Sequence, residues 1–477
     1  MAMGGSLFTG LQVALSGLEA QQTVMAVTSH NVANATTPGY ERQQADLAAN
    51  PPYTPPSLQQ VQGAGQLGMG VTVASIQRSN SRFLHLQQWA NAGDLGAAGQ
   101  QAQTLSQVQS MLNEPSSTGL NSALSAFWNA WQDVANSPQS TAARSQAVAA
   151  GSALASQFHT LSSDLTSLQS SLNSSVGAQI GRVNTYASQI ASLNGQIKAS
   201  IAAGQKPNDL LDARAVAISK LSTLVPVHVT WNTDGTAAVS VGSVDVVAGT
   251  QVTPLVGKAQ ASNHGFLQPQ WNPPGLPAQL HGGSLGALLT LRDQTLPGYL
   301  ASLNALAGGV GSSVNQLHAS GYDLHGNPGQ AYFVASGGGG ITAANIAVNP
   351  ALVSDPTLVA AAASATSGPG DGHNALAIAD LQSQALPVLA NGGTATASGA
   401  WAAMVGGIGS AAQAASSAQQ NQQVLANSIQ SQQQQVSGVS INEEMTNMVV
   451  AQNAYAAAAK VSSTIDSMLG SLIAMVP

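Results

Sequence analysis

Apolar residues recur at alternating spacings of four and three near both ends of the 477-residue chain. The N-terminal series runs from Leu7 to Val32 and the C-terminal series from Ile441 to Leu472, after a slip of one residue within it. This pattern predicts helices with one narrow apolar seam, which is typical of a coiled-coil strand rather than of a helix in a globular core. We therefore expect the two ends to pair with each other, or with the same segments of neighbouring molecules.

The residues expected to form this assembly interface occupy seam positions or end the first helix. They are Leu7, Leu11, Leu18, Met25, Asn31, Asn34, Met445, Met448, Tyr455, Ile465, Met468 and Leu472. Asn tolerates the left-handed backbone that closes a helix, and the sequence TPGY at 37–40 favours a turn. The first helix is thus expected to stop near Asn34.

The middle of the chain has helical periodicity with one interruption. Helices are predicted over about 140–203, 208–224, 284–318 and 399–436, with Asn208 or Asp209 as the N-cap of the second. Residues 225–281 alternate apolar and polar side chains, and Asp234-Gly235 is a hairpin signal. The expected fold class is mainly α, with terminal coiled-coil helices, a long-helix bundle and a small antiparallel β excursion.

Four segments follow from these patterns. We expect a terminal coiled-coil domain from 1–47 with 438–477, an extended arm or linker at 48–80, a long-helix bundle from 81–224 with 282–437, and the β excursion at 225–281. Residues 71–77 within the arm alternate and are expected to form a strand.

Charged residues make up only 6% of the chain, against roughly 25% in an average domain. The net charge is −7 and Lys and Arg form no cluster, so neither nucleic acid nor a membrane surface is an expected partner. No stretch reaches the roughly 18 apolar residues of a membrane span. The N-terminus lacks a basic region, so no cleaved signal peptide is expected. The absence of cysteine excludes disulfides and thiolate sites.

Catalytic and metal-binding interpretations find little support in the sequence. Gly282 to Gly286 satisfies the GxSxG pattern of hydrolases, but LPAQLH precedes it instead of an apolar strand, and Ser284 is better placed as a helix N-cap. His318, Asp323 and His325 are too few and too scattered for a zinc site. Phe127, Trp128 and Trp131 are interpreted as core residues rather than a binding hot spot. We expect no catalytic residue, no metal and no cofactor.

Two terminal motifs resemble those of the flagellar axial proteins, the group of rod, hook and hook-associated proteins. They are SHNVANATTPGYERQ at 29–43 and SGVSINEEMTNMVVAQNAYAAAAKVSSTIDSMLGSLI at 437–473. Four internal pieces resemble the hook–filament junction proteins of that group: NDLLDARAVAISKLSTLV (208–225), GGSLGALLTLRD (282–293), VNQLHASGYDLHGNPG (314–329) and DGHNALAIADL (371–381). The terminal motifs indicate the group, and the internal pieces indicate the junction proteins within it.

The resemblance implies a non-enzymatic structural subunit of the bacterial flagellum, exported to the exterior by the flagellar type III system. Its implied partners are the hook protein, the second hook–filament junction protein, copies of itself in a helical ring, and an export chaperone at the C-terminal segment. Another axial subunit, a rod or hook protein, is the first alternative. A secreted hydrolase using Ser284 is the second and weaker alternative.

Overall fold

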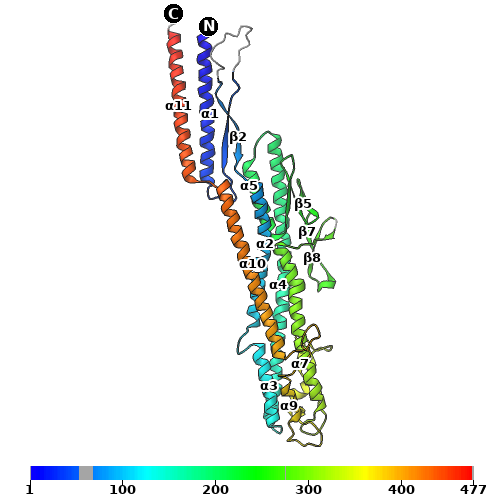
Figure 1. The fold of residues 1–477 in the computed structure, drawn as a ribbon. Coiled ribbons are helices and arrows are strands. Elements are labelled where there is room, and N and C mark those ends of the chain that lie inside the picture. The colour runs from blue at the N-terminus through cyan, green and yellow to red at the C-terminus, as the bar shows by residue number, and fades with distance from the viewer. Residues whose placement is uncertain (1, 53–67, 274, 475–477) are drawn as a thin grey trace. The chain divides into compact units, whose positions relative to one another are not determined.

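The structure is a computed structural model that describes residues 2–52, 68–273 and 275–474. Long helices dominate it, and the strands form small antiparallel sheets (Figure 1). This arrangement confirms the mainly α fold class expected from the sequence.

The chain divides into two compact units. The terminal unit consists of Met1–Gly93, Arg182–Pro254 and Gln423–Pro477, and the middle unit consists of Asp94–Gly181 and Leu255–Gln422. These bounds differ from those of the four expected segments, because the long helices α4 (Thr141–Ala202) and α10 (Ala397–Ser437) contribute residues to both units.

The terminal unit contains the first and last helices of the chain and the strands that follow the first. Besides the ends of α4 and α10, its elements are α1 (Ala2–Asn34), β1 (Gln43–Ala49), β2 (Val71–Arg78), the start of α2 (Arg82–Leu112), α5 (Asn208–Leu224), β3 (His228–Trp231), β4 (Ala237–Val241), β5 (Val244–Ala248), β6 (Gln251–Val252) and α11 (Ile441–Ala474). In Figure 1, α1 and α11 lie side by side, with the N- and C-terminal labels at the same end of the pair.

Strands β1 and β2 form an antiparallel hairpin that contacts α1. Gln43 pairs with Arg78 and Ala49 pairs with Val71, with one irregularity between Asp46 and Leu47. The backbone N–H of Val71 donates to Ser16 Oγ of α1 at 3.2 Å. The strand expected at 71–77 is thus present, whereas residues 53–67 of the expected arm lie outside the described residues.

The β excursion consists of two sheets rather than one. Strands β3 to β6 form a four-stranded sheet in sequence order within the terminal unit. The predicted hairpin joins β3 to β4, with Gly235 at a positive φ of 83° and the Asp234 carboxylate accepting from the Thr236 N–H. The second sheet belongs to the middle unit and has the order β7–β8–β9.

The middle unit is built mainly from helices around a small set of short strands. Besides its parts of α2, α4 and α10, its elements are α3 (Leu120–Asn136), β7 (Leu255–Ala259), η1 (Ala261–Asn263), β8 (Leu267–Trp271), β9 (Leu276–Pro277), α6 (Gly283–Thr290), the π-helical turn η2 (Leu291–Thr295), α7 (Leu296–Ser320), β10 (Phe333–Ala335), β11 (Ile346–Val348), α8 (Pro350–Ser354), η3 (Pro356–Leu358) and α9 (His373–Asp380). The helices expected at 208–224 and 399–436 are α5 and α10, and the one expected at 284–318 is divided into α6, η2 and α7.

An aromatic cluster fills the core of the middle unit. Phe127, Trp128 and Trp131 of α3 are buried, and the Phe127 ring lies 5.8 Å from that of Tyr332 and 5.5 Å from that of Phe333 between centroids. Large side chains are rare in this chain, so grouping them in one place supplies the apolar volume that Ala and Gly cannot. The interpretation of these residues as core is confirmed.

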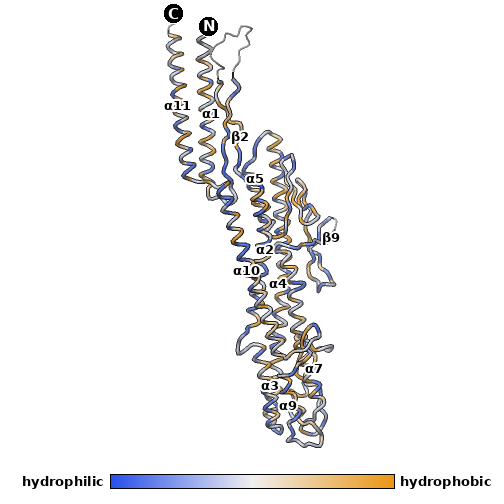
Figure 2. Tube along the Cα trace, viewed as in Figure 1, coloured by the Kyte–Doolittle hydropathy of each residue, from blue (hydrophilic) through white to orange (hydrophobic). Residues whose placement is uncertain are grey.

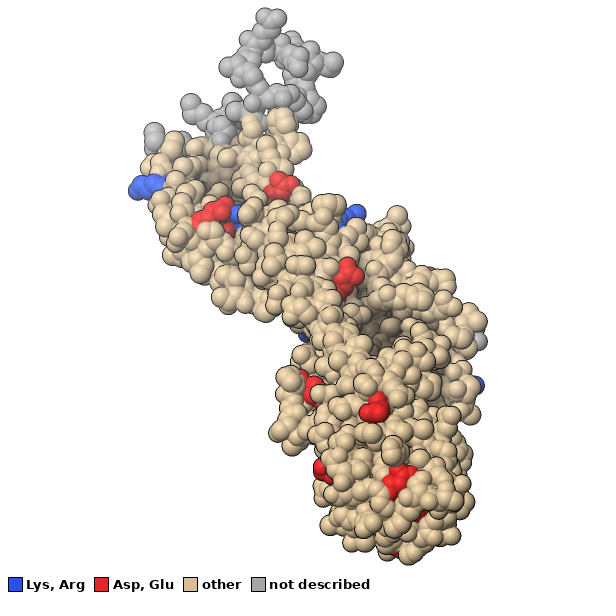
Figure 3. All heavy atoms as spheres, turned by 60° about the horizontal axis from the view of Figure 1, so that its bottom comes forward, with Lys and Arg blue, Asp and Glu red and all other residues tan. Residues whose placement is uncertain are grey.

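The chain has few charged residues. Along α1 and α11, hydrophobic positions alternate with hydrophilic ones (Figure 2). Within the described residues, every helix falls short of the length and apolar character that crossing a membrane requires. Most of the face drawn in Figure 3 is neither acidic nor basic.

Candidate functional site

The antiparallel pair of α1 and α11 is the candidate assembly element, and small side chains line its contact. A Cβ added at Gly10 would lie 3.2 Å from Ile465 Cδ1, and one added at Gly17 would lie 3.7 Å from the Cβ of Ala458. Ala20 of α1 and Ala451 of α11 are almost fully buried. Such residues let two helix backbones approach closely, but they bury little apolar area.

The expected α1 seam residues Leu7, Leu11, Leu18 and Met25 are all half-buried. The fully buried apolar positions are instead Ala14, Ala20 and Val27, which lie beside the predicted seam or within it. The contact face of α1 is therefore wider than the predicted seam, because α1 also contacts the β1–β2 hairpin.

Some of the α11 residues expected at the assembly interface are buried or half-buried, and others are exposed to solvent. Ile465 is buried and Met448 is half-buried, whereas Met445, Tyr455 and Met468 are exposed. The side chain of Leu472 lies outside the described residues. The pairing face of α11 thus uses fewer of the large apolar side chains than the sequence pattern predicts, since small residues such as Ala451 and Ala458 occupy it.

Asn31 is the most fully bonded residue of the candidate site. Its Nδ2 donates to the backbone oxygen of Gln43 at 2.8 Å and to Glu444 Oε2 at 3.0 Å. Its Oδ1 accepts from the Gln43 N–H at 2.9 Å and from the Tyr40 hydroxyl at 2.8 Å. An amide side chain has two donor hydrogens and two acceptor lone pairs, so all four sites are used. Asn31 and Glu444 are both buried.

Asn34 has a local role at the end of α1. Its Nδ2 donates to the backbone oxygen of His30, and its Oδ1 accepts from the Thr37 hydroxyl. Its backbone oxygen accepts from the Thr37 N–H at 2.9 Å. Asn34 therefore shapes the turn that follows the helix, and the structure does not bring it to α11.

The turn after α1 carries Tyr40 back to the helix. The Tyr40 hydroxyl lies 3.0 Å from His30 Nδ1 as well as bonding to Asn31. Burial, together with the nearby carboxylates of Asp209, Asp212 and Glu444, raises the pKa of Tyr40, which keeps the hydroxyl a hydrogen-bond donor.

Gly39 is the one residue of this turn whose backbone requires glycine. Its φ is 81°, and an added Cβ would lie 2.2 Å from Val216 Cγ2 of α5. The TPGY sequence thus fits a close approach between the turn and α5.

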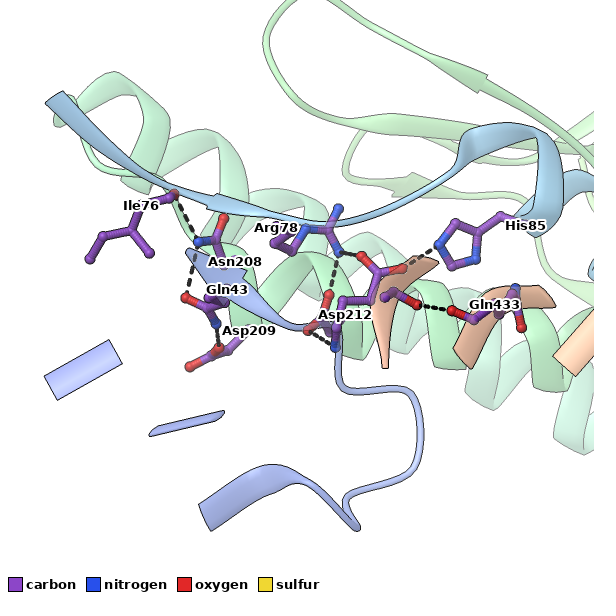
Figure 4. Close-up of polar contacts among 10 residues, drawn as sticks. Gln43, Ile76, Arg78, His85, Asn208, Asp209, Asp212 and Gln433 are labelled. Carbon is purple, nitrogen blue, oxygen red and sulfur yellow. Dashed lines mark hydrogen bonds and ion pairs between the residues drawn. The ribbon is translucent and has the colours of Figure 1, made fainter. Parts of the chain in front are cut away.

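A second polar group, which we call the polar anchor, consists of Glu41, Arg78, His85 and Asp212 (Figure 4). Arg78 Nη1 lies 3.0 Å from Glu41 Oε2 and pairs with Asp212 Oδ1. His85 Nε2 lies 2.6 Å from Glu41 Oε1, and the Glu41 N–H donates to Asp212 Oδ2 at 3.1 Å. Burial raises the pKa of Asp212 to about 6, although Arg78 opposes this shift. The anchor joins the loop after α1 to β2, α2 and α5.

Gln43 links the same loop to the start of α5. Its Nε2 donates to Asp209 Oδ1 at 2.7 Å, and its Oε1 accepts from Asn208 Nδ2 at 3.1 Å (Figure 4). Asn208 Nδ2 also donates to the Ile76 backbone oxygen of β2 at 3.0 Å.

Arg42 connects the loop to the junction of α10 and α11. Its backbone N–H donates to the Ser437 oxygen at 2.8 Å, and its Nη1 lies 2.8 Å from Glu443 Oε1. A further bond joins Gln433 of α10 to Gln88 of α2 at 3.1 Å. These bonds join the loop after α1 to the end of α10 and the start of α11, and α10 to α2.

Sequence reasoning missed the polar anchor. It selected Asn31 but not Glu41, Arg78, His85 or Asp212, because the partners of these four residues are distant in sequence. One signal was present: a chain with 6% charged residues that places Asp209 and Asp212 in one short helix must pair or expose them.

The hydrolase interpretation has no support in the geometry around Ser284. This residue lies inside α6, whose N-cap is Gly282, so its expected N-cap role is wrong. The Ser284 hydroxyl donates to the amide oxygen of Gln179 at 3.0 Å, and an amide cannot serve as a general base.

His318 is held as a core residue rather than as a metal ligand. Its Nδ1 lies 2.5 Å from the Gln330 backbone oxygen, and its Nε2 accepts from the Ala360 N–H at 2.9 Å. Within the described residues, no group of three or more His, Asp or Glu side chains could hold a metal ion.

Comparison with known proteins gives one consistent family. The chain is 31% identical to the flagellar hook-associated protein 1 of Bacillus subtilis, over 98% of each chain. The chain belongs to the flagellar hook-associated protein 1 family. The family member from Escherichia coli is 25% identical over 96% of this chain and 98% of its own length. The member from Salmonella typhimurium is 29% identical over 67% of this chain and 58% of its own.

Family models agree with this assignment along the chain. The hook-associated protein FlgK helical domain matches residues 105–333, the flagellar basal body rod FlgEFG protein C-terminal model matches 430–475, and the flagella basal body rod protein model matches 11–40. The solved structure of the hook junction protein FlgK from Burkholderia pseudomallei has the same fold, with a TM-score of 0.65 at 21% identity, and the match covers 74% of this chain and all of that one.

Proposed function

We propose that this member of the hook-associated protein 1 family is a structural subunit of the bacterial flagellum, acting as an adaptor at the hook–filament junction. The observation that carries the proposal is the set of large apolar side chains that α11 leaves exposed after pairing with α1. They are Ile441, Met445, Val449, Val450, Tyr455, Val461, Met468 and Ile473. Phe8 and Leu15 are similarly exposed on α1.

These side chains are more exposed than those in the seam between the two helices. The α1–α11 contact uses Gly and Ala, so the larger side chains face outward. Fully burying one such side chain contributes roughly 1.5–3 kcal/mol. The assembly-interface role of Leu7, Leu11, Leu18, Met25, Met445, Met448, Tyr455, Ile465, Met468 and Leu472 therefore belongs to this proposal, with the exposed members facing neighbouring subunits.

The proposed partners are other flagellar axial proteins and an export chaperone. One end of a ring of copies of this chain packs on the hook protein, and the other accepts the second junction protein. Before assembly, the C-terminal segment binds an export chaperone, and the chain leaves the cell by the flagellar export route. The FlgK helical domain match over 105–333 favours this adaptor role over that of a rod or hook subunit.

Loss of the gene tests the role directly. We expect cells without it to build hooks that lack filaments and to shed flagellin into the medium. The wild-type chain supplied in trans should restore filaments. Filaments of normal number on the deletion strain would contradict the adaptor role.

The exposed apolar set is tested by Met445→Asp in the same complementation. A charge there must be desolvated when a neighbour packs, at a cost of several kcal/mol, so we expect filament attachment to be lost while secretion of the chain continues. Asn453→Asp is the matched control, since it adds the same charge at an exposed polar position of α11. Equal attachment by both variants would contradict the role of the exposed set.

A further inference from the structure

We propose that Asn31 and Glu444 set the register of the α1–α11 pair, so that the exposed faces of both helices reach neighbouring subunits in one defined alignment. The inference rests on the proposed assembly function for its biological role, but its physical content concerns the free chain. Asn31 and Glu444 are positioning residues, since both are buried and bond to each other.

The pair has one constant register over its length. Three contacts define it: Gly10 with Ile465, Gly17 with Ala458, and Asn31 with Glu444. The step of seven from Gly10 to Gly17 on α1 is matched by seven from Ala458 to Ile465 on α11, and the step of fourteen from Gly17 to Asn31 is matched by fourteen from Glu444 to Ala458. The helices are therefore antiparallel with two-turn repeats in phase.

The small residues of the contact select this register only weakly. Gly17 faces Ala458, but a slip of one helical turn would place it against Ala454 or Ser462, which are also small. The sequence from 456 to 459 is four consecutive alanines. Several alignments would thus keep a small residue opposite Gly17, and this part of the seam specifies the register weakly.

The hydrogen bond between Asn31 and Glu444 does select the register. A slip in one direction would place Asn31 against Met448, and a slip in the other would place it against Ser440, before α11 begins. Either slip leaves the buried Glu444 carboxylate without the Asn31 donor. An unpaired buried charged group costs more than the net gain of one hydrogen bond, so the penalty falls on every wrong register.

Further hydrogen bonds and an ion pair fix the positions of Asn31 and of the start of α11. The backbone N–H and oxygen of Gln43 both bond to the Asn31 side chain. Arg42 bonds to Ser437 at the end of α10 and pairs with Glu443 in the first turn of α11. The loop between α1 and β1 thus binds both helices. A single buried polar contact in an apolar seam is the best-attested device for fixing helix register.

Disulfide mapping tests the register in the full-length chain, which has no cysteine of its own. The native-register pair is Gly17→Cys with Ala458→Cys, whose Cβ atoms would lie 3.7 Å apart, within the roughly 3.5–4.5 Å that disulfides span. The shifted pairs are Gly17→Cys with Ala454→Cys, and Gly17→Cys with Ser462→Cys. We expect the native pair to oxidise at least about tenfold faster than either shifted pair, as loss of one charge-assisted hydrogen bond implies.

The register variant is Asn31→Ala with Glu444→Ala, which removes both sides of the interhelical contact and also the bonds of Asn31 to Gln43 and Tyr40. We expect the tenfold preference to fall to within about threefold in this background. Glu444→Gln is the conservative variant: it keeps an acceptor oxygen for Asn31 and should retain the preference. If circular dichroism shows the double variant unfolded, Glu444→Leu, which removes the acceptor but fills the space, replaces it.

The outcomes separate this inference from the proposed function. Full register preference in the double variant, or its loss in Glu444→Gln, overturns the register role. Neither result depends on hooks. If instead the crosslinks behave as expected but Met445→Asp still attaches filaments, the register holds and the assembly face is misassigned.

Discussion

Buried polar residues stabilise each unit from within. His318 is the clearest case in the middle unit. Burial lowers the pKa of His318 to about 4, and the positive charge of Arg144 acts in the same direction. The Nε2 atom accepts from the Ala360 N–H, so protonating this atom would remove the bond and bury a charge. The fold therefore selects the neutral ring.

A pH dependence of stability follows. Because the folded pKa lies below the ordinary 6.5, the stabilisation is present above pH 6.5 and is lost as pH falls toward 4. Between pH 7 and pH 5 we expect the free energy of unfolding of the middle unit to fall by about 2 kcal/mol. Urea unfolding followed by tryptophan fluorescence measures it, since the rings of Trp131 and His318 lie 5.9 Å apart.

Two variants isolate the contribution of His318. His318→Gln removes the titrating ring and should abolish this part of the pH dependence, although it also lowers stability at pH 7. His325→Gln removes an exposed ring and should leave the dependence unchanged. If both variants keep the full pH dependence, another group is responsible.

At the scale of elements, the terminal helices leave many of their large apolar side chains exposed, among them Phe8 and Met445. Apart from their bonded base, α1 and α11 meet where Gly10 faces Ile465 and Gly17 faces Ala458, whereas the α5 core includes Ile218 and Leu221. We expect amide hydrogen exchange in the free chain to be much faster over 7–27 and 448–470 than over α5, and to slow after assembly on hooks. Equal protection of α5 and the terminal helices in the free chain would contradict this.

Most helices could be predicted from the sequence because their periodicity is local. The predicted helix at 208–224 is α5 to the residue, yet its expected N-cap is wrong: Asn208 is already helical and its side chain bonds to Gln43 and to Ile76 of β2. That choice depends on a partner 165 positions away, which no local pattern contains. Asn31 could be identified because it lies at the predicted end of a helix, which is a local signal. The residues of the polar anchor carry no local signal, because their partners are distant in sequence.

For the whole molecule, the low charge content shapes its association. The 31 charged side chains that the sequence supplies are few, and Glu41, Arg78, Asp212 and Glu444 are directed into the terminal unit itself. Contacts between subunits would then rest mainly on apolar and Gln side chains. We expect attachment to isolated hooks to change little between about 50 and about 500 mM salt, since screening weakens only exposed charge pairs. A salt titration of reconstituted junctions measures this, and loss of most binding over that range would assign the contacts to charges.

The pairing of α1 with α11 also has a consequence for incomplete chains. Asn31 and Glu444 are 413 positions apart, so the bond between them forms only when nearly the entire polypeptide is present. A fragment truncated anywhere before α11 keeps Asn31 without its carboxylate partner and α1 without its companion helix. We therefore expect a subunit that ends before α11 to have no aligned helix pair to offer to the growing structure.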